Sequence, residues 1–188
     1  MKRYICTAVV AVTLTIVAGC GGGGEPAGSN STPAATTTTT EAAAGEATVE
    51  QYASLVASHV GLWGEVVDNI DDSCSDPNAV AACSAYYLTA SFQAESINIE
   101  LTAAHDPACR DNPNCISYVG EVPDEITTLV TDTEAAAEDY VTAYNAWEAT
   151  GCADPLDSAC AAGEGFAMSF ALESLTQQFD GWSPYTAG

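Results

Sequence analysis

Apolar residues recur at intervals of three and four positions in four separate stretches of the chain. These stretches cover residues 49–70, 80–104, 126–147 and 168–182. Such spacing places the apolar side chains on one face of an α-helix, and no two-residue alternation typical of a β-strand competes with it. The sequence therefore predicts four amphipathic helices. The predicted core-facing positions are Val49, Tyr52, Val56, Trp63, Val66 and Ile70; Val80, Cys83, Tyr87, Ala90, Ala94, Ile97, Leu101 and Ala104; Ile126, Val130, Ala137, Tyr140, Tyr144 and Trp147; and Met168, Leu172, Leu175, Phe179 and Trp182.

Cap signals indicate where the first three helices begin. Thr48 is followed three residues later by Gln51, which is the arrangement of a capping box. The second helix is expected directly after Asp76-Pro77, an acidic cap followed by proline at the first helical position. The third is expected near Pro123-Asp124-Glu125, because acidic side chains stabilise a helix N-terminus.

The start of the fourth helix is less distinct, because Gly163 and Gly165 interrupt the pattern after Asp157-Ser158. Four helices of roughly 20 to 28 residues with short connections are typical of an up-down-up-down four-helix bundle. We therefore predict an all-α domain over residues 47–182, followed by a short C-terminal tail at 183–188.

The N-terminus has the form of an export signal. Lys2 and Arg3 precede an uncharged, mostly apolar run from Tyr4 to Gly19. Sixteen helical residues span about 24 Å, which is less than the ~30 Å hydrocarbon core of a bilayer. The run ends in Val17-Ala18-Gly19-Cys20, which resembles the lipobox of bacterial lipoproteins. The resemblance implies cleavage of a signal peptide at residues 1–19, thioether lipidation of Cys20, and anchoring on the outer face of the bacterial cell membrane. The alternative is an ordinary secretory signal with a chance cysteine.

Residues 20–46, here called the tether, contain no large apolar side chain. Such a segment buries too little surface to offset the entropy of ordering it, so we expect it to be disordered. A Gly/Ser/Thr-rich coil of this length has a root-mean-square reach of roughly 30 Å. The tether would therefore hold the helical domain away from a membrane.

Six cysteines remain once Cys6 in the signal and the lipidated Cys20 are set aside. In an oxidising compartment an even set of this kind predicts disulfides. The six fall into three close pairs, each flanking turn residues, so the simplest pairing is between sequence neighbours, with each bond stapling a turn between helices. A zinc site is the alternative, but there is no C-x-x-C pair and the histidines lack finger spacing. The predicted disulfides are Cys74–Cys83, Cys109–Cys115 and Cys152–Cys160.

Removal of residues 1–19 leaves 26 acidic residues and one basic residue, Arg110, for a net charge of −25. A field of this sign repels nucleic acids and anionic lipid headgroups, so we expect no nucleic-acid partner. The charge suits a cationic ligand or protein, and the alternative is that it serves solubility alone. The oligomeric state and the partner are not indicated by the sequence.

His59 is the weak candidate for a metal or haem ligand, because it lies on the predicted inner face of the first helix. A hydrogen-bonded core histidine explains it as well. His105 lies at the end of the second helix, where a surface role is expected. No Glu-x-x-His motif supports a di-iron site. The acidic residues that crowd the turns, such as Asp76 and Asp157, are explained by caps, and a calcium site is the alternative.

The chain carries no recognisable catalytic motif, so we expect neither an enzyme nor a cofactor. The favoured hypothesis is a lipid-anchored acidic module at the cell surface that binds a protein or a cationic ligand. One alternative is a carrier of a small ligand, metal or haem that uses the bundle interior at His59. Another is a phage-exclusion or other surface-defence lipoprotein of the envelope.

Overall fold

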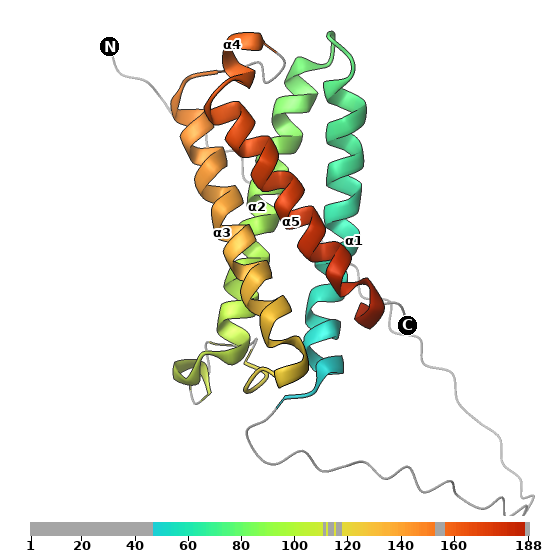
Figure 1. The fold of residues 1–188 in the computed structure, drawn as a ribbon, viewed down its shortest axis with the longest axis vertical. Helices are drawn as coiled ribbons and strands as arrows, with labels where there is room; N and C mark the ends of the chain where they lie inside the picture. Colours follow the sequence, from blue (N-terminus) through green and yellow to red (C-terminus); the bar gives the residue numbers. More distant parts are fainter. Residues whose placement is uncertain (1–46, 111, 113–114, 116–117, 153–156, 187–188) are drawn as a thin grey trace, which may run out of the picture. The chain divides into compact units, whose positions relative to one another are not determined.

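Four long helices carry most of the part of the chain that the structure describes (Figure 1). The structure, a computed structural model, describes residues 47–110, 112, 115, 118–152 and 157–186. The predicted signal peptide at 1–19, Cys20 and the tether at 20–46 lie outside these residues. Within them, no helix is both long enough and apolar enough to cross a membrane. The helical elements are α1 (Val49–Cys74), α2 (Val80–His105), η1 (Pro107–Cys109), η2 (Asp124–Ile126), α3 (Thr127–Ala149), α4 (Ser158–Ala161) and α5 (Glu164–Thr186).

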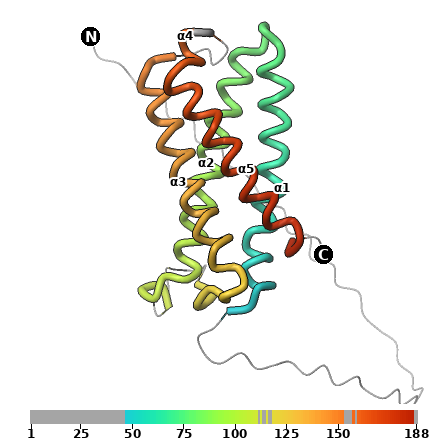
Figure 2. The backbone as a smooth tube through the Cα atoms, viewed as in Figure 1, coloured from blue at the N-terminus to red at the C-terminus, as the bar shows by residue number. Residues whose placement is uncertain are grey.

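The long helices pack into a helical bundle. α1 contacts α2 and α5, and α3 contacts the same two helices. Figure 2 shows α5 lying obliquely across α1 and α3. The all-α prediction is confirmed: the described residues contain helices and turns and no β-strand.

The apolar face of each helix forms one shared core. The predicted core positions are buried, except that Val49, Val80 and Leu172 are only partly buried. Two indoles sit at its centre. Trp63 of α1 makes an edge contact with Tyr140 of α3, with ring centroids 5.7 Å apart, and Trp182 of α5 is completely buried. Large aromatic side chains therefore join helices that are distant in sequence.

The start of α1 follows the prediction, whereas the start of α2 does not. The Thr48 hydroxyl accepts from the Gln51 N–H at 3.3 Å, and Gln51 Oε1 accepts from the Thr48 N–H at 2.8 Å, which completes the capping box. α2 begins at Val80 rather than at Pro77. Asp76 accepts from the Asn78 backbone at 2.8 Å, so its carboxylate stabilises the turn and does not cap the helix.

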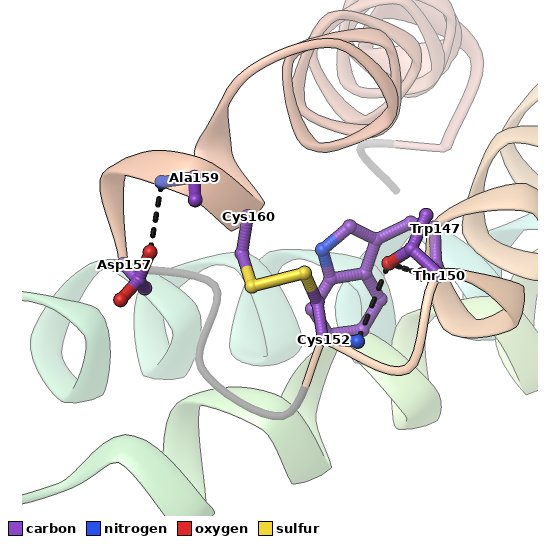
Figure 3. Close-up of a disulfide and its surroundings, with 6 residues drawn as sticks. All are labelled: Trp147, Thr150, Cys152, Asp157, Ala159 and Cys160. Atoms are coloured by element: carbon purple, nitrogen blue, oxygen red, sulfur yellow. Dashed lines mark hydrogen bonds between the residues drawn. A yellow bond between two sulfur atoms is a disulfide. The ribbon is translucent and has the colours of Figure 1, made fainter.

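The structure contains a fifth, short helix that the sequence analysis did not separate from the fourth. Asp157 caps α4, and its carboxylate accepts from the Ala159 N–H at 2.8 Å (Figure 3). Gly163 then adopts φ +64°, a left-handed conformation that favours glycine and ends the turn. α5 begins at Glu164 and continues to Thr186, beyond the last predicted core position at Trp182.

All three predicted disulfides are present, and they differ in what they join. Cys74–Cys83 ties the end of α1 to the first turn of α2, as expected. Cys109–Cys115 closes a loop within the connection between α2 and α3, so it does not join two helices directly. Cys152–Cys160 links the segment after α3 to α4 rather than to α5 (Figure 3).

Candidate functional site

An open groove of about 370 Å³ runs along the surface between α3 and α5. This volume lies within the range of small ligand pockets. Its lining is mostly apolar, with two carboxylates and one large aromatic ring. The lining residues are Asp139, Thr142, Ala143 and Ala146 of α3, and Glu164, Ala167, Phe170, Ala171 and Ser174 of α5. We refer to this feature as the α3/α5 groove.

The groove exists because small side chains occupy the flank where the two helices meet. On α3 the large residues Tyr140, Tyr144 and Trp147 are buried in the core, and alanines lie beside them. On α5 the large side chains of Met168 and Leu175 are likewise buried in the core. A methyl group fills much less space than an aromatic ring, so the surface is hollowed there.

Phe170 forms a wall of the α3/α5 groove and is 66% exposed. Phe166, one turn earlier on α5, is 70% exposed. Neither ring was predicted to be a site residue, because both lie out of phase with the buried positions Met168 and Leu175. The signal was available: phenylalanines two residues before and two residues after Met168 cannot share its buried face of one helix.

The two carboxylates lie at opposite ends of the α3/α5 groove. A side chain added at Gly165 would meet Trp147, and the Trp182 indole donates to the Thr133 hydroxyl at 3.0 Å. Rising residue numbers on α5 therefore match falling numbers on α3, so these two helices run antiparallel. Glu164 thus lies at the Ala146 end of the groove, and Asp139 lies toward the Ser174 end.

His59 is buried, as predicted, and lies on α1 away from the residues that line the groove. Its Nε2 atom is 3.1 Å from Oε2 of Glu100 on α2. Only 8% of the His59 side chain is exposed, whereas 40% of the Glu100 side chain is. Nδ1 of His59 is buried and has no partner among the described residues. The contact with Glu100 makes His59 a link between α1 and α2.

His105 forms a similar link between α2 and α3. Its Nε2 atom is 2.9 Å from Oε1 of Glu134, and the same oxygen accepts from the Thr102 hydroxyl at 3.1 Å. The sequence placed His105 at a helix end but gave no indication of Glu134, because the contact depends on how two helices pack. Both side chains are partly exposed.

Acidic residues near the turns act mainly as local caps. Asp106 accepts from the Ala108 N–H at 2.8 Å, as Asp157 does from Ala159. In the part of the chain that the structure describes, no three His, Cys, Asp or Glu residues lie close enough together to hold a metal ion.

Four buried tyrosines have raised pKa values. Burial, assisted by Glu134 and Tyr118, raises the pKa of Tyr52 to about 12. Burial also raises the pKa of Tyr140, whose hydroxyl donates to the Tyr87 carbonyl at 3.1 Å. The pKa values of Tyr87 and Tyr144 are raised for the same reason. These phenols stay protonated near neutral pH, and Tyr52 and Tyr140 act as hydrogen-bond donors to backbone carbonyls.

No protein-family model, curated protein or solved structure matches this chain. A function must therefore be argued from the groove, the charge and the N-terminal sequence. Of the residues that the sequence singled out, the structure joins the six cysteines as predicted and pairs His59 with Glu100. It does not bring the histidines or the acidic clusters into one site.

Proposed function

We propose that this chain is an exported, lipid-anchored binding module that recognises a cationic partner outside the membrane and carries out no chemistry itself. The observation that carries the proposal is the α3/α5 groove, an open apolar surface with a carboxylate toward each end. Apolar concave surfaces with a few polar groups are typical of binding sites. The wider charge points the same way, because the chain has a net charge of −23.

The anchor and the tether belong to the same proposal. Cys20 would carry a diacylglycerol group, and residues 21–46 would form the flexible spacer between the lipid and α1. The supporting pattern is the sequence Val17-Ala18-Gly19-Cys20 behind a short uncharged run. Disulfides are favoured in an oxidising, extracytoplasmic compartment, and three of them close short loops in the helical domain.

We also propose that the four long helices form an up-down-up-down bundle. The antiparallel match of α3 with α5 supports this topology. So does Cys74–Cys83, because a bond between the last turn of α1 and the first turn of α2 holds those two ends together. In this arrangement α3 and α5 are neighbours, and the groove between them faces outward.

The two alternatives from the sequence have less support. A carrier would use His59, but that side chain contacts Glu100 and does not line the α3/α5 groove. A phage-exclusion or other surface-defence lipoprotein would share the anchor and the acidic domain. No residue indicates such a role, so phage exclusion or surface defence stays an alternative function for the chain.

The anchor can be tested by expressing the chain in a bacterium with Cys20→Ala. We expect the protein to move from the membrane fraction to the soluble exported fraction, and mass spectrometry to detect the acyl group on the unaltered chain only. Cys6→Ala is the matched control and should leave the protein membrane-bound. A Cys20→Ala protein that stays in the membrane fraction would show that the anchor proposal is wrong.

Partner binding can be tested on intact cells by carbodiimide cross-linking, which joins carboxylates to amines. The chain has no lysine after Lys2, so its cross-links should run from its own acidic residues to amines of another molecule. We expect a basic partner to be cross-linked to the anchored chain, and much less of it when high salt is present during the reaction. Only neutral or acidic partners, or cross-linking that is equally efficient in high salt, would contradict a cationic partner.

A further inference from the structure

We propose that the α3/α5 groove binds a cationic amphipathic helix, with an apolar side chain between the alanines and Phe170 and basic side chains at the two acidic ends. This inference rests on the proposed binding function and adds the site and the chemical class of the partner. A helix laid in an apolar groove is a recurrent mode of peptide recognition.

The apolar part of the groove fits one or two large side chains. Ala143 and Ala146 of α3 face Ala167 and Ala171 of α5 across it. Phe170 stands beside them with 66% of its surface exposed to water. Covering this ring and filling the space beside it would remove apolar surface from water, which is the main favourable term in association.

The spacing of the charges suits a helix. Glu164 lies beside the Trp147 turn of α3, because its neighbour Gly165 lies close to Trp147. Trp147 is eight residues from Asp139, so the backbone positions of the two carboxylates are about 12 Å apart at 1.5 Å per residue. Basic residues about seven or eight positions apart on a partner helix span the same distance, with apolar residues one turn inside each. Arginine or lysine at these positions would complement both carboxylates.

The occupant is a different molecule rather than a second copy of this chain. Arg110 is the one basic residue after residue 3, and it lies in the connection between α2 and α3, where its side chain donates to Tyr118. A second copy from which the proposed signal peptide has been removed therefore has no pair of basic residues to match Asp139 and Glu164. Two chains, each with a net charge of −23, also repel one another.

The experiment measures the affinity of a synthetic amphipathic peptide of about 14 residues, with two leucines flanked by arginines about seven positions apart. A scrambled peptide of the same composition is the ligand control. The protein is the whole chain with Cys20→Ala, so that no lipid contributes to binding. Fluorescence anisotropy at low and high salt gives Kd for each variant.

Phe170→Ala should weaken binding by about fivefold or more, because an exposed ring that becomes buried contributes on the order of 1 kcal/mol or more. Phe92→Ala is the matched control, since Phe92 is 60% exposed on α2 and lies outside the groove. The pair Asp139→Asn and Glu164→Gln should weaken binding severalfold at low salt and much less at high salt. Asp72→Asn with Glu95→Gln is its control, because it changes the net charge equally on exposed residues of α1 and α2.

The possible results separate the groove from the general function. If the patterned peptide binds but the groove variants and their controls lose affinity equally, the groove is not the binding site. The proposal that the acidic domain binds a cationic partner would still hold. If the patterned and scrambled peptides bind equally well, the helical partner is overturned. If neither peptide binds at low salt, both the inference and the proposed cationic partner are overturned.

Discussion

Two core tryptophans donate their indole N–H groups to threonine hydroxyls on other helices. Trp63 of α1 donates to Thr176 of α5, and Trp182 of α5 donates to Thr133 of α3, each at 3.0 Å. Thr133 in turn donates to the carbonyl of Leu129 at 2.7 Å. These bonds allow large amphipathic rings to be buried without leaving their polar atoms unpaired, and they specify which helix faces which.

Thr133→Val tests how much one such hydrogen bond contributes to the free energy of unfolding. Valine keeps the shape of threonine but leaves the Trp182 N–H buried without an acceptor, so we expect a loss of about 1–3 kcal/mol in the free energy of unfolding. Thr131→Val is the control, because Thr131 is exposed on the same helix and donates only to its own backbone turn. Urea denaturation of both variants would measure the difference, and equal stabilities would show that the indole bond is dispensable.

Tyr52 gives the molecule a pH dependence on the alkaline side. Its hydroxyl donates to the carbonyl of Gly120 at 2.9 Å, and its pKa is raised from 10.0 in the unfolded chain to about 12 in the folded one. Above pH 10 the unfolded state loses this proton while the folded state keeps it, so stability falls as the pH rises from 10 through 12. Tyr52→Phe should flatten this fall, measured by urea denaturation between pH 8 and 12.

Tyr185→Phe serves as the control for that measurement, because Tyr185 is only partly buried near the end of α5. Tyr52→Phe should also lower stability at pH 8, since the Gly120 carbonyl loses its donor. An unchanged alkaline slope in Tyr52→Phe would mean that other buried tyrosines, such as Tyr140, account for the pH dependence.

The backbones of α4 and α5 approach each other closely at Gly165. A Cβ atom at Gly165 would clash with the Cys160 carbonyl of α4, so only glycine fits at this point. Gly163, just before α5, turns the chain between the two helices. The Cys152–Cys160 bond holds α4 in place on the other side. Backbone contact and a covalent bond therefore keep a four-residue helix that could not persist alone.

Gly165→Ala should destabilise the domain by about 1–3 kcal/mol, because the added methyl group must displace backbone. Gly64→Ala should do the reverse. Gly64 lies inside α1 with open space around it, so alanine should add about 0.5–1 kcal/mol through its helix propensity. Thermal unfolding of both variants gives the comparison. Opposite shifts in Tm are expected, and a stabilised Gly165→Ala chain would contradict the close packing of α4 on α5.

Helix periodicity predicted the core positions because burial repeats along each helix with the period of the helix itself. Cysteine spacing predicted the three disulfides because each pair encloses only a short turn. The predicted start of α2 was wrong. An aspartate such as Asp76 can accept from backbone N–H groups either of a helix N-terminus or of a nearby turn, and in the folded chain it accepts from the turn. The α3/α5 groove could not be predicted, since it arises from alanines of two helices far apart in sequence.

At the scale of the whole molecule, the most unusual property is the shortage of basic residues. The acidic side chains are distributed over every long helix and most turns, and Arg110 alone represents arginine and lysine after residue 3. Its guanidinium stacks over the Tyr118 ring at 5.8 Å, and its Nε donates to the Tyr118 hydroxyl at 3.0 Å. The same residue lies between Cys109 and Cys115, which are bonded to each other.

Trypsin cleaves after lysine and arginine, so it can cut the helical domain only after Arg110. The expected product runs as one band on a non-reducing gel and as two fragments after reduction, because Cys109–Cys115 spans the cut. Arg110→Gln should leave the domain intact under both conditions. Two separate fragments without reductant would show that the bond is absent in solution.

The Cys109–Cys115 bond therefore keeps the two parts of the domain covalently joined after a cut at Arg110. A protease that cleaves after basic residues can open the peptide chain of the helical domain only after Arg110, and the bond still joins both halves. If the chain is anchored at a cell surface as proposed, separation of the two halves would require reduction of that bond. Its lifetime there should then depend on the local redox potential more than on the amount of trypsin-like protease.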